Sequence, residues 1–456
     1  MNTNHPAPTP KAVKNPISMG KRDIVRFTVP VVIDNFATTS IGLLYSALVG
    51  KISSSALAAV GLANSTINVL ISACAVLTTG SAILMARHVG AGDREEASRT
   101  IEQSILFTAL MSGFIALITI VFANPIMQLL IRTDDASIFG ECVLYFRLLM
   151  VSFPFLLIYN MLVSVLRGAG NSRSPLIASV LLNLVQIAAA YLCINVLGLD
   201  LIGAGIAYII CRMFGCAYML TAALRTHGKF QINLKNLIHP RFDIFKRICR
   251  VGIPVSGEGV FINSGYLIAN SMVVGLGTYY ASVYQVINTL QTFTNILHAI
   301  CNATVLTLAG QFLGAGEPEK AKKCTIIVWA AGTAGTFLIS LGVCHAGNYL
   351  CGLYSSDAQV VADAAKNLWW VLGMSTVCVT TNVIDPALRA GGDTKFIMYN
   401  VFFAIWVIRL GLTYLLCYVL DWGIAGIYLG NLANLTERSI AGWIRFLQGK
   451  WQKIKI

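Results

Sequence analysis

Long apolar stretches alternate with short polar segments along almost the entire chain. Each stretch has about 20 residues or more, the length that an α-helix needs to cross a hydrocarbon core of about 30 Å. The pattern therefore predicts an all-α membrane protein with twelve transmembrane helices. We expect these helices near residues 24–49, 56–86, 100–122, 140–166, 176–197, 204–224, 251–275, 281–310, 324–348, 364–388, 396–420 and 424–444.

Composition narrows the class of protein. Hydrophobic residues make up 56% of the chain, charged residues only 12%, and the mean hydropathy is +0.71, which leaves too little polar surface for a soluble domain. No phosphate-binding loop motif occurs, and His298 and His345 lie apart from any acidic or cysteine cluster. The twelve cysteines form no C-x-x-C pair and fit small buried residues. We expect no enzymatic activity, no catalytic residue, no metal centre and no organic cofactor.

The net charge of +13 is distributed according to membrane sidedness. If the N-terminus is cytoplasmic, the segments on that side hold 27 of the 33 Lys and Arg residues, and the opposite loops hold only Lys51, Arg132 and Lys366. This bias is the positive-inside rule. It predicts a multi-pass plasma membrane protein with both termini in the cytoplasm, and it attributes the basic charge to topology and lipid contact, not to nucleic acid.

Matching motifs occur twice in the chain. Arg26, Pro30, Val31 and Asp34 spell R-x-x-x-P-V-x-x-D, and the same pattern returns 224 residues later with Glu258 as its acid. The run G-A-G-D at 90–93 is answered by G-A-G-E at 314–317, and R-G-A-G-N-S at 167–172 by R-A-G-G-D-T at 389–394. Further matches join Asn64 to Asn288, Asp200 to Asp421 and Gly205 to Gly426.

This duplication predicts the domain organisation. Six helices per half return the chain to the same side of the membrane, so the halves should be parallel repeats about an axis along the membrane normal. Repeated membrane halves are typical of secondary transporters, whose substrate sites lie between the repeats. We expect a cytoplasmic tail at 1–23, an N-lobe at 24–224, a connector at 225–250, a C-lobe at 251–444 and a second tail at 445–456.

The order and repetition of these motifs resemble the multidrug and toxic compound extrusion (MATE) family. The resemblance rests on the two G-A-G-[DE]-x-E-x-A runs, on the L-R-G-A-G-N-S and L-R-A-G-G-D-T runs, and on Val49-Gly50 followed by A-L-A-A-V-G at 56–61. It implies two six-helix bundles that export organic, often cationic compounds in exchange for protons or sodium ions.

The chain departs from the family at several acidic positions. The resemblance implies an acidic residue at four positions where this chain has another residue. These residues are Tyr45 in the first helix, Ile187 in the fifth, about Ile262 in the seventh and Cys378 in the tenth. The family's best-known cation-binding carboxylates therefore cannot be transferred to this chain, although Asn183 remains.

Asp34 and Glu258 are the strongest candidates for ion coupling. Each lies about eight residues inside an apolar run, and a carboxylate near a helix centre costs about 2.5 kcal/mol or more. Such a group can exchange a proton or ligate sodium with nearby amide oxygens, or it can brace the kinked helix by a structural hydrogen bond. The predicted coupling set is Asp34, Glu258, Asn183, Gln186, Asn64 and Asn288, with Asn68, Asn263 and Asn382 as further amides.

Two arginines are expected near the middle of helices. Arg212 and Arg409 could neutralise Asp34 or Glu258, extend toward the membrane surface, or bind an anionic substrate. Asp385 is expected to pair with Arg389, four residues later on the same helix. The predicted substrate-cavity residues are Tyr45, Phe36, Asn35, Phe261, Gln285, Arg409 and Arg212, and the predicted structural turns use Gly90, Gly92, Gly314, Gly316, Arg167 and Arg389.

The favoured hypothesis is a monomeric, proton- or sodium-coupled antiporter that exports small organic, cationic or amphipathic compounds by alternating access. One alternative is a flippase of lipid-linked sugars, which should line its cavity with several cationic side chains to hold pyrophosphate. A second alternative is an exporter of an anionic metabolite.

Overall fold

The structure is a computed structural model that describes residues 29, 30, 33, 66–130, 136–226, 230–233, 240–354 and 357–454. Its described secondary structure is helical. The expected first transmembrane helix, at 24–49, falls almost wholly outside these residues, as do Asp34, Asn35, Phe36, Tyr45 and Asn64.

The N-lobe begins, in its described part, with a short helix at Thr66–Ala73 that meets the next helix at an angle of 43°. The following elements match the expected spans in order and type. They are α3 (Ala75–Ala91), α4 (Arg94–Val121), α5 (Ala123–Leu130), α6 (Ala136–Gly168), α7 (Arg173–Tyr191), the π-helix η1 (Leu192–Val196) and α8 (Asp200–Leu224).

The C-lobe repeats this order. Its eleventh expected span is a composite of α-helical and π-helical segments, from Thr394 to Val419. The elements are α9 (Phe242–Gly275), α10 (Thr278–Gly314), α11 (Pro318–His345), α12 (Gly347–Gly352), α13 (Ala358–Ala390), α14 (Thr394–Phe402), η3 (Phe403–Arg409), α15 (Leu410–Tyr414), η4 (Leu415–Val419), α16 (Ile424–Leu447) and η5 (Lys450–Lys453).

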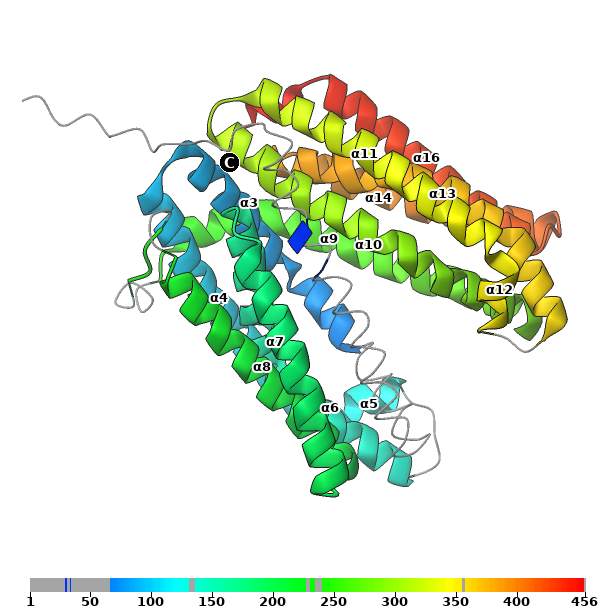
Figure 1. Cartoon of the computed structure of the whole chain (residues 1–456), viewed down its shortest axis with the longest axis horizontal. Helices are drawn as coiled ribbons and strands as arrows, with labels where there is room; N and C mark the ends of the chain where they lie inside the picture. The colour runs from blue at the N-terminus through cyan, green and yellow to red at the C-terminus, as the bar shows by residue number, and fades with distance from the viewer. Residues whose placement is uncertain are drawn as a thin grey trace, which may run out of the picture.

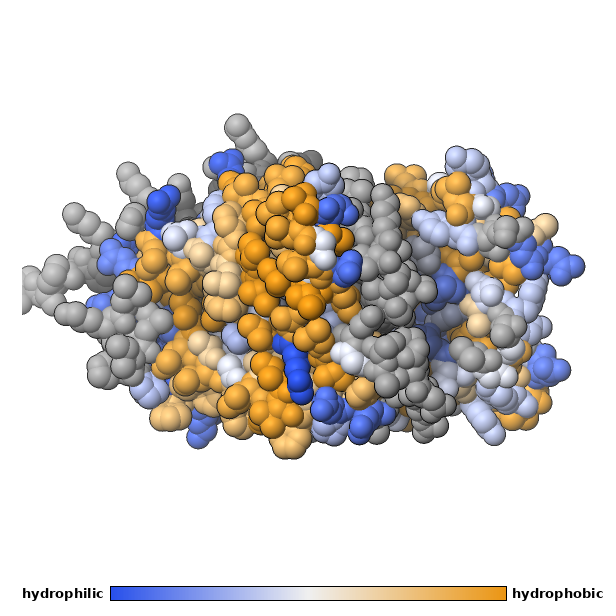
Figure 2. Space-filling view, turned by 90° about the horizontal axis from the view of Figure 1, so that it is seen from below, coloured by the Kyte–Doolittle hydropathy of each residue, from blue (hydrophilic) through white to orange (hydrophobic). Residues whose placement is uncertain are grey.

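The surface confirms a membrane setting. Eight described helices, or nine with the bent pair at 66–91 counted as one span, are long and apolar enough to cross a bilayer. Large side chains such as Leu110, Phe114 and Leu117 on α4 are about two-thirds exposed, which a protein in water would avoid. Figure 2 shows a broad hydrophobic surface of this kind. The chain is therefore an all-α membrane protein, as the pattern of apolar stretches predicts.

The two lobes diverge from one end of the molecule like the arms of a V (Figure 1). Within the C-lobe, α10 packs against α11 and α13, and within the N-lobe α6 packs against α4 and α8. The lobes meet mainly where α3 of the N-lobe contacts α9 and α10 of the C-lobe. The described C-terminal residues lie at this joined end (Figure 1).

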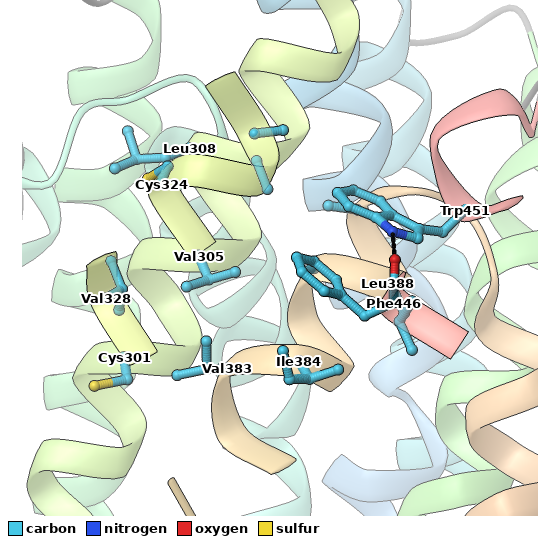
Figure 3. Close-up of a cluster of buried hydrophobic side chains, with 14 of the residues drawn as sticks. Cys301, Val305, Leu308, Cys324, Val328, Val383, Ile384, Leu388, Phe446 and Trp451 are labelled. Carbon is cyan, nitrogen blue, oxygen red and sulfur yellow. Dashed lines mark hydrogen bonds between the residues drawn. The ribbon is translucent and has the colours of Figure 1, made fainter. Parts of the chain in front are cut away.

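The C-terminal segment is part of the C-lobe core. The Trp451 side chain is fully buried, stacks on Phe446 with ring centroids 5.1 Å apart, and donates a hydrogen bond to the Phe446 carbonyl oxygen. Figure 3 shows these rings beside Leu388 of α13. The segment expected as a tail, 445–456, thus includes the last turn of α16 and a buried anchor.

The repeat is visible in backbone geometry. Gly92 and Gly316 both have φ near +74° (73° and 74°), and Gly170 and Gly392 have φ of 79° and 87°. Glycine adopts this left-handed region without steric cost, which explains its use after these helices. Asp200 and Asp421 share a positive φ as well, and the π-helices η1 and η4 stand at matching positions of the two lobes.

The connector is fixed to α4 over its described residues. The backbone N–H groups of Gln231, Asn233 and Arg241 donate hydrogen bonds to Ser98, Glu102 and Gln103, respectively. Helix α9 begins at Phe242, so the last part of the expected 225–250 connector is helical.

Candidate functional site

Two glycines of the repeated G-A-G motif allow the lobes to cross. A Cβ atom at Gly90 would lie 2.1 Å from the carbonyl oxygen of Gln311, and a Cβ atom at Gly314 would lie 2.1 Å from that of Arg87. No residue with a side chain fits at such a separation. Gly90 and Gly314 were expected in turns; instead they lie in α3 and α10, where they bring the two backbones together, while Gly92 and Gly316 form the turns.

Hydrogen bonds across the lobes follow the same symmetry. Arg87 of α3 donates to the carbonyl oxygens of Ala390, Gly391 and Ile454 at 2.9–3.0 Å. Gln311, its match in the repeat, donates to the carbonyl oxygen of Gly168 at 2.7 Å. Each side chain therefore caps the end of a helix in the opposite lobe, since the last carbonyls of a helix have no partner of their own. We call Arg87, Gln311, Gly90 and Gly314 the lobe crossing.

A second feature is a buried group of four charges inside the C-lobe. Arg389 of α13 contacts both carboxylate oxygens of Glu258 of α9 at 2.6 Å. Arg438 of α16 lies 2.8 Å from Asp385 of α13 and 3.8 Å from Glu258. We call Glu258, Asp385, Arg389 and Arg438 the C-lobe charge cluster. It ties together three helices that are far apart in sequence.

The cluster corrects one expectation and removes one of the alternatives for Arg409. Asp385 does not use Arg389 as its hydrogen-bond partner; Arg438 fills that place, while Arg389 reaches across to α9. Arg409 does not neutralise Glu258, because the two arginines of the cluster already do so. Both outcomes have the same physical reason. Pairing between helices gives Glu258 and Asp385 one arginine each, whereas a pair between Asp385 and Arg389 within α13 would leave Glu258 buried without its closest cation.

The four side chains of the cluster are largely buried, so their ion pairs affect the stability of the fold. The exposed fraction of the side chain is 3% for Glu258 and 4% for Asp385, and 15% and 11% for Arg389 and Arg438. Two positive and two negative groups leave the cluster neutral. Removing one partner from a buried pair is strongly destabilising, because a charge remains away from water without compensation.

The predicted amide ligands are dispersed. In the N-lobe, Asn183 donates to the Ser179 hydroxyl at 3.4 Å, and Gln186 accepts a long 3.8 Å contact from the Cys211 thiol. In the C-lobe, Asn263 bonds to Ser72 of the N-lobe and Asn382 to the Cys378 carbonyl oxygen. Asn288 is half-buried and Gln285 is exposed. No group of three His, Cys, Asp or Glu residues within the described ranges could hold a metal ion.

Arg409 is buried without an ionic partner in the part of the chain that the structure describes. Its exposed fraction is 1%, and both terminal nitrogens lack hydrogen-bond acceptors. The guanidinium lies over the Tyr266 ring, 4.2 Å from its centroid, a cation–π contact. Arg212 is half-buried and lies 5.3 Å from the Tyr208 ring centroid. Phe261 packs edge-on against Phe402.

Arg87, Gln311, Glu437 and Arg438 were not singled out from the sequence. Arg87 and Gln311 are related by the 224-residue offset, so the repeat itself could have identified them. Arg438 lies nine residues before the end of α16, and its side chain reaches Asp385 inside the C-lobe.

Two helical lobes related by an internal repeat and joined at one end define a membrane transporter. The MatE family model matches the chain twice, over residues 30–192 and 254–415, and these segments are the two sequence repeats. The chain belongs to the multidrug and toxic compound extrusion (MATE) family.

Related proteins match along almost their full length. A probable multidrug resistance protein NorM of Thermotoga maritima is 24% identical over 445 residues, which cover 95% of this chain and 93% of the relative. A multidrug resistance protein MdtK of Pectobacterium atrosepticum is also 24% identical, with 94% and 95% covered.

Solved structures confirm the fold. An outward-facing MATE family transporter of the MOP superfamily has a TM-score of 0.85 at 20% identity and covers 96% of this chain and 98% of its own. A MOP superfamily transporter from Pyrococcus furiosus has the same TM-score and identity, with 95% and 97% covered. The twelve-helix architecture of these transporters is the fold of this chain.

Proposed function

We propose that this protein is an ion-coupled antiporter that exports small organic cations or amphipathic compounds by alternating access. The observation that carries the proposal is the lobe crossing. Contacts related by the repeat hold the lobes together at one end, while the other ends of the lobes are apart (Figure 1). A joint of this kind is one of the two states that alternating access requires.

The charge bias supports a direction for this state. Basic residues gather in the loops beside the lobe crossing, so the positive-inside rule assigns the joined end to the cytoplasm and the open end to the outside. In the proposed cycle, binding of the coupling ion from outside leads to release of the lobe crossing. The lobes then expose the substrate path to the cytoplasm.

The proposed coupling groups are Asp34 and Glu258, the acids that the repeat places at matching positions. Both carboxylate oxygens of Glu258 accept hydrogen bonds from Arg389. A proton on Glu258 would weaken these hydrogen bonds and leave the arginine without its counter-charge. Uptake of one proton would thereby loosen the ionic link between α9 and α13. Sodium is the less favoured ion at Glu258, because its oxygens already have cationic partners.

Transport in proteoliposomes tests the proposal. Purified protein is reconstituted in one orientation, and a proton or a sodium gradient is imposed, one at a time, in the presence of ethidium. We expect one of the two gradients to drive ethidium movement against its own gradient. Ethidium flux that ignores both gradients would refute ion coupling, and the absence of flux for a panel of organic cations would refute the substrate class.

Arg409 favours a second candidate, the export of an anionic metabolite. A buried guanidinium with free donors is suited to a carboxylate or phosphate, and Thr413, one turn further along, also has a buried hydroxyl without a partner in the described ranges. Flux of radiolabelled benzoate that is lost in Arg409→Gln, with ethidium flux absent, would support this function in place of the first.

A further inference from the structure

An apolar groove runs along the outer face of α16. It has a volume of about 620 Å³, and its walls include Ile408 of η3 together with Leu432, Thr436, Ile440 and Ile444 of α16. The main packing partners of α16 are elements of the C-lobe, and Figure 1 shows α16 at the edge of the C-lobe that faces away from the N-lobe. Ile440 and Ile444 are more than half exposed on this face. In a membrane protein such a face meets lipid.

One carboxylate lines this groove. Glu437 is the only ionisable residue among its walls, and one of its oxygens is buried without a hydrogen-bond partner in the described part of the chain. The next residue, Arg438, forms its ion pairs with Asp385 and Glu258, and no ion pair between Arg438 and Glu437 is formed in the described part of the chain. Glu437 is therefore an acid without an ion-pair partner among the described residues, and a cation in the groove would supply the counter-charge of its ionised form.

The position of Glu437 along α16 also favours a cationic ligand. Glu437 lies ten residues before the end of α16, which corresponds to about 15 Å of helix rise. The carboxylate is therefore near the middle of a helix of 24 residues. The twelve-helix fold makes α16 a membrane helix, so an ionised acid at this position is costly. A site at this depth gains stability from a ligand that brings both apolar surface and a positive charge.

We propose that the groove between α16 and η3 binds a lipophilic organic cation from the bilayer, with Glu437 as its counter-ion. The volume is within the range of about 300–1,000 Å³ typical of small-molecule pockets. The apolar walls fit a hydrocarbon or aromatic body, and the carboxylate distinguishes cations from neutral lipids and from anionic ones. The inference deepens the proposed function and rests on its substrate class, because it gives such compounds a point of contact on the lipid-facing side of the C-lobe.

Tetraphenylphosphonium and tetraphenylborate provide a matched test, since they have nearly the same size and shape and opposite charge. Binding of each is measured to purified protein in phosphatidylcholine nanodiscs, whose surface has no net charge. An azidophenyl derivative of the phosphonium is then photolysed on the protein, and the labelled peptides are mapped by mass spectrometry. We expect labelling of α16 between Thr436 and Ile444.

Substitutions decide the role of the carboxylate. Glu437→Gln should reduce labelling of α16 by the phosphonium at least tenfold and leave tetraphenylborate binding unchanged or stronger. Glu319→Gln, at an exposed acid in the first turn of α11, is the control and should label as the wild type does. If Glu437→Gln does not fold, Ile440→Trp narrows the groove without touching the carboxylate and should also abolish labelling. Unchanged labelling in a folded Glu437→Gln variant would overturn the proposal.

Two further results separate this site from the proposed function. Labelling that depends on Glu437 in a protein that transports no cation would uphold the site and refute the exporter. Ion-driven cation transport with label found only on other helices would refute the site and uphold the exporter. A dimer in native mass spectrometry that dissociates in Glu437→Gln would overturn the proposal by assigning the groove to a partner helix.

Discussion

Four ionisable residues of the C-lobe differ in their counter-charges. Glu258 and Asp385 have arginine partners, Glu437 of the outer groove has none, and Arg409 has only an aromatic face among the described residues. A paired charge stabilises the fold and can act in coupling only by breaking its pair. An unpaired charge needs a ligand, a proton or an ion to compensate it.

The first prediction concerns Asp34, which the repeat matches to Glu258. Asp34→Asn keeps the shape of the side chain but cannot release a proton, so gradient-driven ethidium exchange should fall at least tenfold. The measurement is flux in proteoliposomes, with Glu319→Gln as a control that keeps its activity. Normal flux in Asp34→Asn, or a loss of flux that only parallels a loss of folded protein, would show that Asp34 is structural.

The second prediction separates coupling from stability at Glu258. Glu258→Gln removes the counter-charge of Arg389 and should destabilise the folded protein by about 3–5 kcal/mol, the usual cost of breaking a buried pair. Adding Arg389→Gln removes the uncompensated charge, so thermal unfolding in detergent should return toward the wild-type temperature. If Glu258 carries the coupling proton, gradient-driven exchange stays absent in the stable double variant. Recovered exchange would restrict Glu258 to a structural role.

At the scale of elements, local pattern predicted most helices but not how they pair. Apolar length identified the spans, and repeated glycines identified the turns at Gly92 and Gly316, because both signals lie in a few consecutive residues. The contacts of Arg438 with Asp385 and of Arg389 with Glu258 join helices 53 and 131 residues apart. Such choices depend on which faces meet in three dimensions, so the sequence also permitted the local pair within α13. The groove around Glu437 required the packing of α16 on η3 as well.

The third prediction concerns the helices of the lobe crossing. Gly90→Ala or Gly314→Ala would place a methyl group 2.1 Å from a carbonyl oxygen of the other lobe, which forces the backbones of α3 and α10 apart. Each substitution should lower the thermal unfolding temperature and favour a state in which the crossing is open. Gly113→Ala in α4, where a Cβ meets nothing within 4 Å, should be neutral or slightly stabilising. Equal stability of the three variants would show that close approach at the crossing is not required.

At the scale of the whole molecule, the duplicated sequence and the V-shaped pair of lobes describe the same symmetry. The offset of 224 residues pairs Arg87 with Gln311 and Gly90 with Gly314, and all four residues meet at one joint. The repeat was readable in the sequence, but the meeting of its copies was not, since sequence similarity carries no information on which surfaces face each other.

The fourth prediction fixes the orientation of the joint in the membrane. Single cysteines are introduced at Lys235 and Lys366 in a cysteine-depleted background, and intact cells are treated with an impermeant thiol reagent. The charge bias predicts that position 366 reacts and position 235 does not. The opposite pattern would place the lobe crossing on the outer side and reverse the proposed state.

The last prediction tests whether the lobe crossing is a gate. Arg87→Met removes three hydrogen bonds to the ends of the opposite lobe, so the joined state should lose stability relative to a state in which these helix ends separate. Spin labels at Glu95 and Glu319, exposed first-turn residues of α4 and α11 that the repeat matches, report the distance between the lobes at this end. Double electron–electron resonance between the two labels should show a new population at longer distance in Arg87→Met. Arg173→Met, at an exposed arginine that begins α7, serves as the control and should keep the wild-type distribution. An unchanged distribution in Arg87→Met, with normal transport, would mean that other contacts hold this end closed.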